Sequence, residues 1–303
     1  MKPLLPQSPN GIWHGAGQSP KAFQAYTACF AEYPPALYMT YCGLKQQSMD
    51  WWKRLDQELA DYGKDVIPQI GLSMTKDGSP ELHYEHEVAA GQYDEQIDIL
   101  IAGLRALGRP AFLRLGYEFN GQWNGYKPQS FIAAWQRITK RLRAADLPHP
   151  IAFVWTYASD GDHKDWNSYY PGDEWVDWWG IDLFSCEHFS AADSLGFAEE
   201  AQQRDFPLMI GESTPRHVGV HDVQAWPRWF QPYIDFIDRF QVRAFCYINW
   251  QWSNYPMWHD WGDGRLEVAP HELRQAWANF LSRPNLVHAR PQAATPTTAP
   301  RNT

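Results

Sequence analysis

Short apolar runs of strand length alternate along this chain with longer segments in which apolar residues recur every three to four positions. This is the pattern of repeated βα units around a parallel sheet. Eight strands are predicted, over residues 11–15, 36–41, 65–72, 111–116, 151–156, 176–184, 206–211 and 244–250. Eight such units predict an α/β fold, a (β/α)₈ TIM barrel that forms a single domain.

Helices are predicted between most of these strands, over residues 19–32, 48–62, 87–107, 128–145, 191–204, 223–240 and 270–281. The connection 157–174 is the exception, because it is rich in Gly, Asp, Asn and Pro and so predicts a short or irregular element. After Arg283 the composition changes to Pro, Ala, Thr and Arg. We therefore expect the barrel to occupy residues 1–283 and residues 284–303 to form a disordered tail or linker.

Composition and charge narrow the classes of partner. Of the 303 residues 44% are hydrophobic, enough for one large core, and the formal net charge is −9. The Lys and Arg residues are scattered, without the basic stripe that nucleic-acid binding requires. No stretch approaches a membrane span, and residues 1–11 hold only Leu4 and Leu5 as an apolar centre, short of a signal-peptide core. We expect a monomer without nucleic-acid or membrane partners, secreted or periplasmic if a leader was removed and otherwise cytoplasmic.

The four cysteines, Cys29, Cys42, Cys186 and Cys246, have no CxxC spacing. The last three lie in or just beyond strand-like runs, where a thiol usually packs as a small apolar group. Buried free thiols are therefore expected, although the even number leaves a disulfide open.

Two of the predicted strands end in a glutamate. The strand 111–116 is followed by Glu118 and then by Asn, Gly and Trp, and the strand 206–211 runs directly into Glu212. If both strands belong to one parallel barrel, both carboxyls lie at its carboxyl-terminal face, where such barrels carry their chemistry. Paired carboxylates among many aromatic residues favour sugar cleavage, which by the retaining route places the two carboxyls about 5 to 5.5 Å apart. For either glutamate alone, an ordinary carboxylate on a solvated loop is the alternative.

Arg114 is expected to lie beside this pair. The two-residue alternation of a strand puts it on the same side as Glu118, inside the barrel. A guanidinium in a barrel interior needs a carboxylate partner. Arg114 is thus interpreted as a support of the catalytic pair, as a structural ion pair, or as both.

The chain contains 17 Trp, 15 Tyr and 15 Phe, and sugar rings stack their apolar faces on aromatic planes. The residues that follow or end predicted strands are expected to line the cleft: Trp123, Tyr126, Trp155, Trp250 and Trp252. The loop 250–261 carries four Trp and is interpreted as a substrate-facing rim, or else as a packed cap. His14 and Asp182 lie near strand exits, where both could hold sugar hydroxyls; a structural role is the alternative for the histidine.

The pair His83 and His86, with Glu85 and Glu87 beside them, invites a metal interpretation. The three-residue spacing alone is weak, and no cysteine or third histidine joins it. We interpret this segment as a solvated loop. Sugar hydrolysis needs no metal or organic cofactor, and the sequence has no Gly-rich phosphate loop, so neither a metal nor a cofactor is predicted.

The chain resembles glycoside hydrolase family 26, which belongs to clan A of the retaining (β/α)₈ enzymes. The acid/base segment of that family reads Arg-Pro-x-His-Glu-x-Asn-Gly-x-Trp, and the matching positions here are Arg114, Glu118, Asn120, Gly121 and Trp123. Residues 169–182 are similar to the family's segment entering strand six, and residues 207–212 fit its pattern around the nucleophile. The resemblance implies that Glu118 is the acid/base and Glu212 the nucleophile. It is close from residue 114 to 212 and extends to the remainder only as fold.

Two departures from the family pattern bear on the site. Tyr117 stands where the family usually has His, and with Asn120 it is counted among the substrate-binding residues. Phe184 stands where the family commonly has a Tyr that donates a hydrogen bond to the nucleophile. Either another residue replaces that hydroxyl, for which Tyr157 and Tyr247 are available, or activity is reduced.

The first functional hypothesis is a retaining endo-β-glycanase acting on a plant- or algal-type polysaccharide, with β-mannan first and β-1,3-xylan or β-glucan next, as the resemblance implies. The second is a non-catalytic carbohydrate-binding barrel that retains the aromatic cleft, motivated by Tyr117 and Phe184. The third is an exo-acting clan A glycosidase, in which long loops after strands two, three and eight block one end of the cleft. The intact pair Glu118 and Glu212 favours an enzyme.

Overall fold

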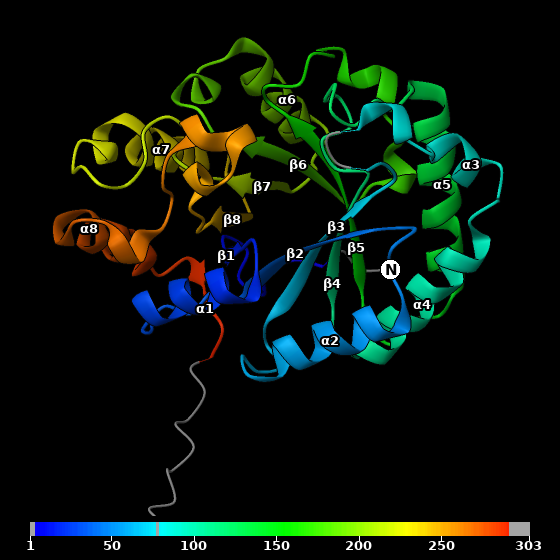
Figure 1. Ribbon diagram of the computed structural model, residues 1–303, viewed down its shortest axis with the longest axis horizontal. Helices are drawn as coiled ribbons and strands as arrows, with labels where there is room; N and C mark the ends of the chain where they lie inside the picture. The colour runs from blue at the N-terminus through cyan, green and yellow to red at the C-terminus, as the bar shows by residue number, and fades with distance from the viewer. Residues whose placement is uncertain (1–3, 77–78, 291–303) are drawn as a thin grey trace, which may run out of the picture.

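The computed structural model describes residues 4–76 and 79–290, and its centre is a closed barrel of eight parallel strands surrounded by helices (Figure 1). The strands follow one another in chain order, and β1 pairs with both β2 and β8, which closes the barrel. They are β1 (Ile12–Gly17), β2 (Leu37–Gly43), β3 (Ile67–Ser73), β4 (Ala111–Leu115), β5 (Ile151–Ala158), β6 (Trp178–Leu183), β7 (Leu208–Ser213) and β8 (Ala244–Ile248). The predicted (β/α)₈ barrel is confirmed, with each strand within two residues of its predicted bounds.

The helices are α1 (Pro20–Cys29), α2 (Met49–Ala60), α3 (Glu85–Ala89), α4 (Asp94–Leu107), α5 (Pro128–Ala144), α6 (Ala192–Gln203), α7 (Gln231–Arg239) and α8 (His271–Leu281). Ser19 and Ser48 cap α1 and α2 by accepting backbone N–H groups of the first turn. The helix predicted over 87–107 is two helices, because the chain turns at Gly91, whose φ is +87°. The connection between β5 and β6 contains only 3₁₀ turns, which confirms the irregular element predicted there.

Strand alternation divides the core into two layers. One layer fills the barrel, where the rings of Trp13, Phe112 and Trp178 meet with centroids 5.2 to 6.3 Å apart. These residues come from β1, β4 and β6, which are not neighbours in the sheet, so they pack across the interior. The other layer lies between the strands and the surrounding helices and includes Trp155 and Trp179. The parity of a residue along its strand therefore decides whether its side chain can reach the central site.

The ordered fold continues past the tail boundary expected at residue 284. Leu286–Val287 form a short strand, β9, that pairs with β1, and Leu286 and Ala289 are buried. The amide of Ala289 donates to the carbonyl of Pro34 at 2.9 Å. Apolar residues within an otherwise polar segment account for this packing. Residues 291–303, the rest of the expected tail, lie outside the described residues.

In the described part of the chain no helix is long and apolar enough to span a bilayer. All four cysteines are free thiols; Cys246 is buried in the barrel and the other three are partly buried. The free thiols are confirmed, and full burial holds for Cys246 alone.

Candidate active site

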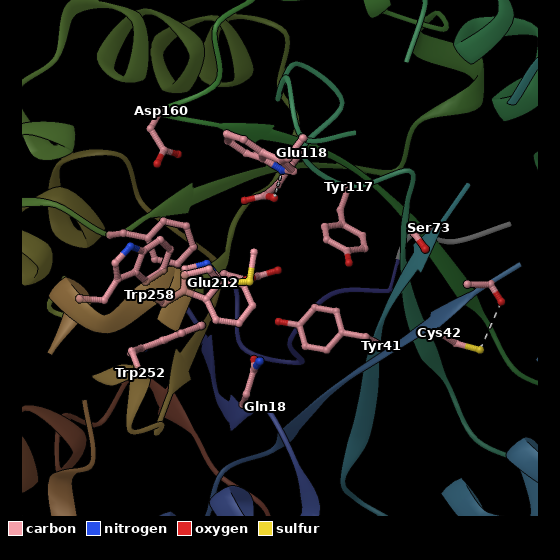
Figure 2. A pocket seen from close by; sticks show the side chains of 15 residues that line it. Gln18, Tyr41, Cys42, Ser73, Tyr117, Glu118, Asp160, Glu212, Trp252 and Trp258 are labelled. Carbon is pink, nitrogen blue, oxygen red and sulfur yellow. Dashed lines mark hydrogen bonds between the residues drawn. The ribbon is translucent and has the colours of Figure 1, made fainter. Parts of the chain in front are cut away.

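A cavity of about 540 Å³ opens at the carboxyl-terminal end of the barrel, and every one of the eight strand ends contributes to its wall (Figure 2). It is lined by Gln18, Tyr41, Cys42, Gly43, Ser73, Tyr117, Glu118, Trp123, Asp160, Phe184, Glu212, Trp252, Met257, Trp258 and Trp261. Glu118 and Glu212 thus face the same cavity, as the positions of their strands predict. This is the end of the barrel at which (β/α)₈ enzymes place their catalytic groups.

Glu118 lies in a tight turn directly after β4. Its φ is +53°, a left-handed conformation that residues other than glycine seldom adopt, and Gly116 shares the same value. The side-chain amide of Asn124 holds the turn by donating to the carbonyl oxygens of Tyr117 (3.0 Å) and Glu118 (2.9 Å). Nε1 of Trp123 donates to Oε2 of Glu118 at 2.7 Å. Backbone and side chain are therefore both held so that the carboxyl faces the cavity.

Glu212 lies in β7, above a buried cluster of charges. Nη1 of Arg114 donates to Oε1 of Glu212 at 2.6 Å, and Nη2 of Arg114 donates to Oδ2 of Asp182. Arg114 and Asp182 are fully buried. Gly211 leaves the space that the guanidinium needs, since a Cβ there would lie 2.5 Å from Nε of Arg114. The prediction that Arg114 points inward and pairs with a carboxylate is confirmed.

The surroundings of the two glutamates differ in charge. Burial raises the pKa of Glu118 well above its usual range, and the negative charge of Glu212 adds to that effect. The smaller influence of Arg114 acts in the opposite direction. Glu212, by contrast, has the guanidinium of Arg114 in direct contact. A carboxyl that holds its proton thus shares a cavity with a carboxylate paired to a cation, the division of states that a general acid and a nucleophile require.

Aromatic side chains form much of the cavity wall. Trp123 lies beside Glu118, and Trp252, Trp258 and Trp261 lie on the loop after β8. The rings of Trp252 and Trp261 pack with centroids 4.8 Å apart, and Nε1 of Trp252 donates to Oγ1 of Thr214. The interpretation of this loop as a rim of the cavity is confirmed for those three residues. Trp250 instead stacks on Tyr255, with centroids 5.9 Å apart, and is not among the residues that line the cavity.

Two residues predicted from their place at strand ends point away from the cavity, because their side chains face the surrounding helices and not the barrel interior. His14 is fully buried, with Nε2 2.7 Å from the hydroxyl of Tyr26 on α1 and Nδ1 3.2 Å from Nδ1 of His288. Trp155 is also fully buried, stacked on Phe119 with centroids 4.5 Å apart. The structural role held open for His14 is therefore the correct interpretation, and Trp155 does not line the cleft.

Three further predicted residues support the site from below its surface. Asn120 is buried and holds the turn against β5. Its side-chain N–H donates to the carbonyl of Ala158, and its side-chain oxygen accepts the backbone N–H of Ala158. The buried hydroxyl of Tyr126 accepts the amide of Met74 at 2.8 Å. Asp182 is the buried partner of Arg114 and so is not placed to hold a sugar hydroxyl. None of these three is among the residues that line the cavity, although all three were predicted to bind substrate.

Several residues that line the cavity were not predicted. Gln18, Tyr41 and Ser73 come from the ends of the first three strands, and Asp160 follows β5. Asp160 forms an ion pair with Arg216 at 2.5 Å. The rule that strand ends build the site could have indicated the first three. No spacing motif marks Asp160, which is placed by its loop.

The segment with two histidines does form a cluster, in which ligand atoms of His83, Glu85 and His86 lie within 4.8 Å of one another. Glu85 is buried, and its Oε1 accepts the amide of Lys127 and the hydroxyl of Ser130 at the start of α5. Its Oε2 is 2.7 Å from Nδ1 of His83. The carboxylate is thus explained by capping α5 and bonding the histidine.

The sequence profile of glycosyl hydrolase family 26 matches residues 72–202. The chain is 30% identical over 232 residues to a β-1,3-xylanase of Alcaligenes sp, covering 66% of this chain and 49% of that protein. It is 30% identical over 261 residues to the β-1,3-xylanase TXYA of Vibrio sp, covering 76% of this chain and 54% of that protein. The chain is thus similar to glycosyl hydrolase family 26 and to two proteins named as β-1,3-xylanases.

A fold match to a solved structure extends over most of the chain. The structure of the Bacillus subtilis mannanase man26 covers 96% of this chain and 91% of its own, with a TM-score of 0.65 at 15% identity. The chain spans about half the length of the two xylanases that it matches.

The two departures from the family 26 pattern both lie in the cavity wall. The ring of Tyr117 packs beside Tyr41. Cζ of Arg114 lies over the ring of Tyr117, 5.0 Å from the ring centroid. Phe184 packs on Trp261, with centroids 5.2 Å apart. Tyr157 and Tyr247 were considered as replacements for the tyrosine hydroxyl that is missing at position 184. Both of their hydroxyls bond elsewhere: that of Tyr157 donates to Asp193, and that of Tyr247 donates to the carbonyl of Gly264.

Proposed function

We propose that this chain is a retaining endo-β-glycanase whose substrate is β-1,3-xylan. The observation that carries the proposal is the placement of Glu118 and Glu212 in one cavity, the first in surroundings that keep it protonated and the second paired with Arg114. From the sequence alone, β-mannan was the first substrate expected. The order is changed because the two relatives described above are named as β-1,3-xylanases.

In the first half of the reaction, a carboxylate oxygen of Glu212 attacks the anomeric carbon of the sugar. A bond forms between them as the glycosidic bond breaks, and Glu118 gives its proton to the departing oxygen. Arg114 keeps Glu212 oriented and supplies positive charge to it. The product of this half is a covalent glycosyl ester on Glu212 and a shortened chain.

In the second half, Glu118 has become a carboxylate and takes a proton from water. That water attacks the anomeric carbon, the ester bond to Glu212 breaks, and the sugar leaves with its original β configuration. Both glutamates return to their starting states. The tryptophans of the cavity wall provide flat apolar surfaces on which sugar rings can stack.

The test is release of reducing sugar from β-1,3-xylan, β-1,4-mannan and mixed-linkage β-glucan, by the native protein and by Glu118→Ala and Glu212→Ala. Glu199→Ala, a change at an exposed ion pair with Arg239, is the matched control. The proposal expects early release of oligosaccharides from β-1,3-xylan, lost in both site variants and kept in the control. Retained polysaccharide binding without turnover would favour the carbohydrate-binding barrel, and release of single sugars from chain ends would favour exo action.

A further inference from the structure

The end of β6 offers Glu212 no hydroxyl, because residue 184 is phenylalanine. The ring of Phe184 packs against Trp261 and against the guanidinium of Arg216. Arg114 donates to Oε1 of Glu212, yet a carboxylate can accept about four hydrogen bonds, so capacity for another donor remains. A nucleophile needs a fixed orientation to attack at the right angle.

Tyr41 lies at the carboxyl end of β2 and points into the barrel. Leu37 and Met39 precede it at two-residue steps and belong to the cluster that fills the barrel, against which Tyr41 also packs. Its partner in register on β3 is Gly71. A Cβ at Gly71 would lie 2.7 Å from Cδ1 of Tyr41 and 3.0 Å from Cε1 of Tyr117, so the glycine makes room for both rings.

The hydroxyl of Tyr41 is buried and makes no hydrogen bond within the described residues. A buried polar group that stays unpaired is costly, and in a native protein it calls for an explanation. The ring extends into the cavity on the side of Glu212 and beside Tyr117 (Figure 2). Burial raises the pKa of Tyr41 well above its usual range, and Glu212 is the charge that adds most to this effect. The phenol therefore stays neutral and can act as a donor.

We propose that the hydroxyl of Tyr41 donates a hydrogen bond to the carboxylate of Glu212 and positions it as nucleophile, from β2 in place of β6. This rests on the proposed function, since it assigns Tyr41 a role in the same site. Tyr41 is a positioning residue: it forms no covalent bond and transfers no proton in either half of the reaction. The donor holds one carboxylate oxygen of Glu212 in place while the other attacks.

The variant that tests this is Tyr41→Phe, which removes only the hydroxyl and keeps the ring that packs at Gly71. On β-1,3-xylan, or on whichever polysaccharide the native protein cleaves, kcat should fall roughly 10- to 100-fold with little change in KM. Tyr157→Phe is the matched control, since it removes a hydroxyl that bonds Asp193 outside the cavity, and it should change neither quantity.

The variant Tyr117→Phe is assayed in the same way as Tyr41→Phe, because the ring of Tyr117 lies next to that of Tyr41 in the cavity wall. A fall of kcat in Tyr117→Phe, with kcat unchanged in Tyr41→Phe, would overturn the proposal. A rise in KM alone in Tyr41→Phe would overturn it as well, since that pattern belongs to contact with the sugar.

A crystal structure of the native protein provides a test that needs no turnover. The proposal expects the phenolic oxygen of Tyr41 within about 3 Å of a Glu212 carboxylate oxygen. A longer separation, with that oxygen bonded elsewhere, would overturn the positioning role even in an active enzyme. If the hydrogen bond is seen and the native protein cleaves no polysaccharide, the proposed function fails while the contact stands.

Discussion

The guanidinium of Arg114 contacts the carboxylate of Glu212 at 2.6 Å across the interior of the barrel. Arg114 comes from β4 and Glu212 from β7, with two strands between them in the sheet. The other arm of the same guanidinium holds Asp182 on β6. One fully buried cation therefore connects three strands and lies directly beneath the carboxyl to which we assign nucleophilic attack.

Replacing Arg114 should destabilise the fold as well as the reaction. Arg114→Gln leaves Asp182 and Glu212 close together without their counter-charge, which should cost about 3 to 5 kcal/mol of the free energy of unfolding. Urea denaturation measures this. Arg239→Gln is the control, because it breaks an exposed pair with Glu199 and should cost at most about 1 kcal/mol. An equally small loss in the Arg114 variant would contradict the account of the cluster.

The stability of the native protein should carry the signature of a protonated Glu118. Burial and the charge of Glu212 raise the pKa of Glu118 in the folded state, so the folded chain keeps a proton that the unfolded chain releases above pH of about 4.3. The free energy of unfolding therefore falls as pH rises from there towards the folded pKa. Glu118→Gln cannot ionise, so its stability relative to the native protein should be near zero at pH 4 and should grow towards pH 8.

Urea titrations at pH 4, 6 and 8 measure this difference. Glu199→Gln, at an exposed position, should show no such growth with pH. A difference between Glu118→Gln and the native protein that stays constant from pH 4 to pH 8 would show that Glu118 ionises normally in the fold.

The indole of Trp123 should affect the pKa of Glu118, the proposed acid. Its N–H donates to Oε2 of Glu118, and a donor to a carboxyl favours the ionised form. Trp123→Phe should therefore move the alkaline limb of the pH–rate profile to higher pH and lower kcat/KM by roughly tenfold. Trp166→Phe removes an indole bond of the same length, to Glu200 outside the cavity, and should leave the profile in place. Equal profiles for both variants would remove Trp123 from the account of Glu118.

The two glutamates should differ in how their loss can be rescued. Glu118→Ala should slow hydrolysis of polysaccharide by about 10² to 10⁴-fold, and much less for aryl glycosides whose leaving group needs no proton. Added azide should restore turnover of the aryl glycoside and yield a β-glycosyl azide, because the small anion attacks the covalent intermediate in place of activated water. Glu212→Ala forms no such intermediate and should give no β-glycosyl azide. A β-azide from Glu212→Ala, or none from Glu118→Ala, would reverse or remove the assigned roles.

The barrel and its two catalytic candidates could be predicted from the sequence because both depend on residues that are close together along the chain. Buried parallel strands appear as short apolar runs, and the residue at each carboxyl end reaches the same face of the barrel. Glu118 and Glu212 follow from this rule, and Arg114 follows from counting back in steps of two. His14 and Trp155 were misplaced by the same rule, since a strand buried on both faces does not reveal which parity faces inward.

The rest of the site depends on contacts that no local pattern records. Tyr41 reaches the cavity beside Tyr117 only because Gly71, on a neighbouring strand, lacks a side chain. Asn120 was assigned to substrate from its place in a motif, yet both ends of its amide are used to hold the turn to β5. An exposed amide and an internally bonded one look alike in sequence.

The most direct test of the central claim is the configuration of the first sugar released, followed by proton NMR during hydrolysis of a soluble β-1,3-xylo-oligosaccharide. Double displacement through Glu212 predicts that the β-anomer appears first and that the α-anomer grows in later by mutarotation. Initial release of the α-anomer would mean a single displacement by water and would contradict the assignment of Glu212 as nucleophile.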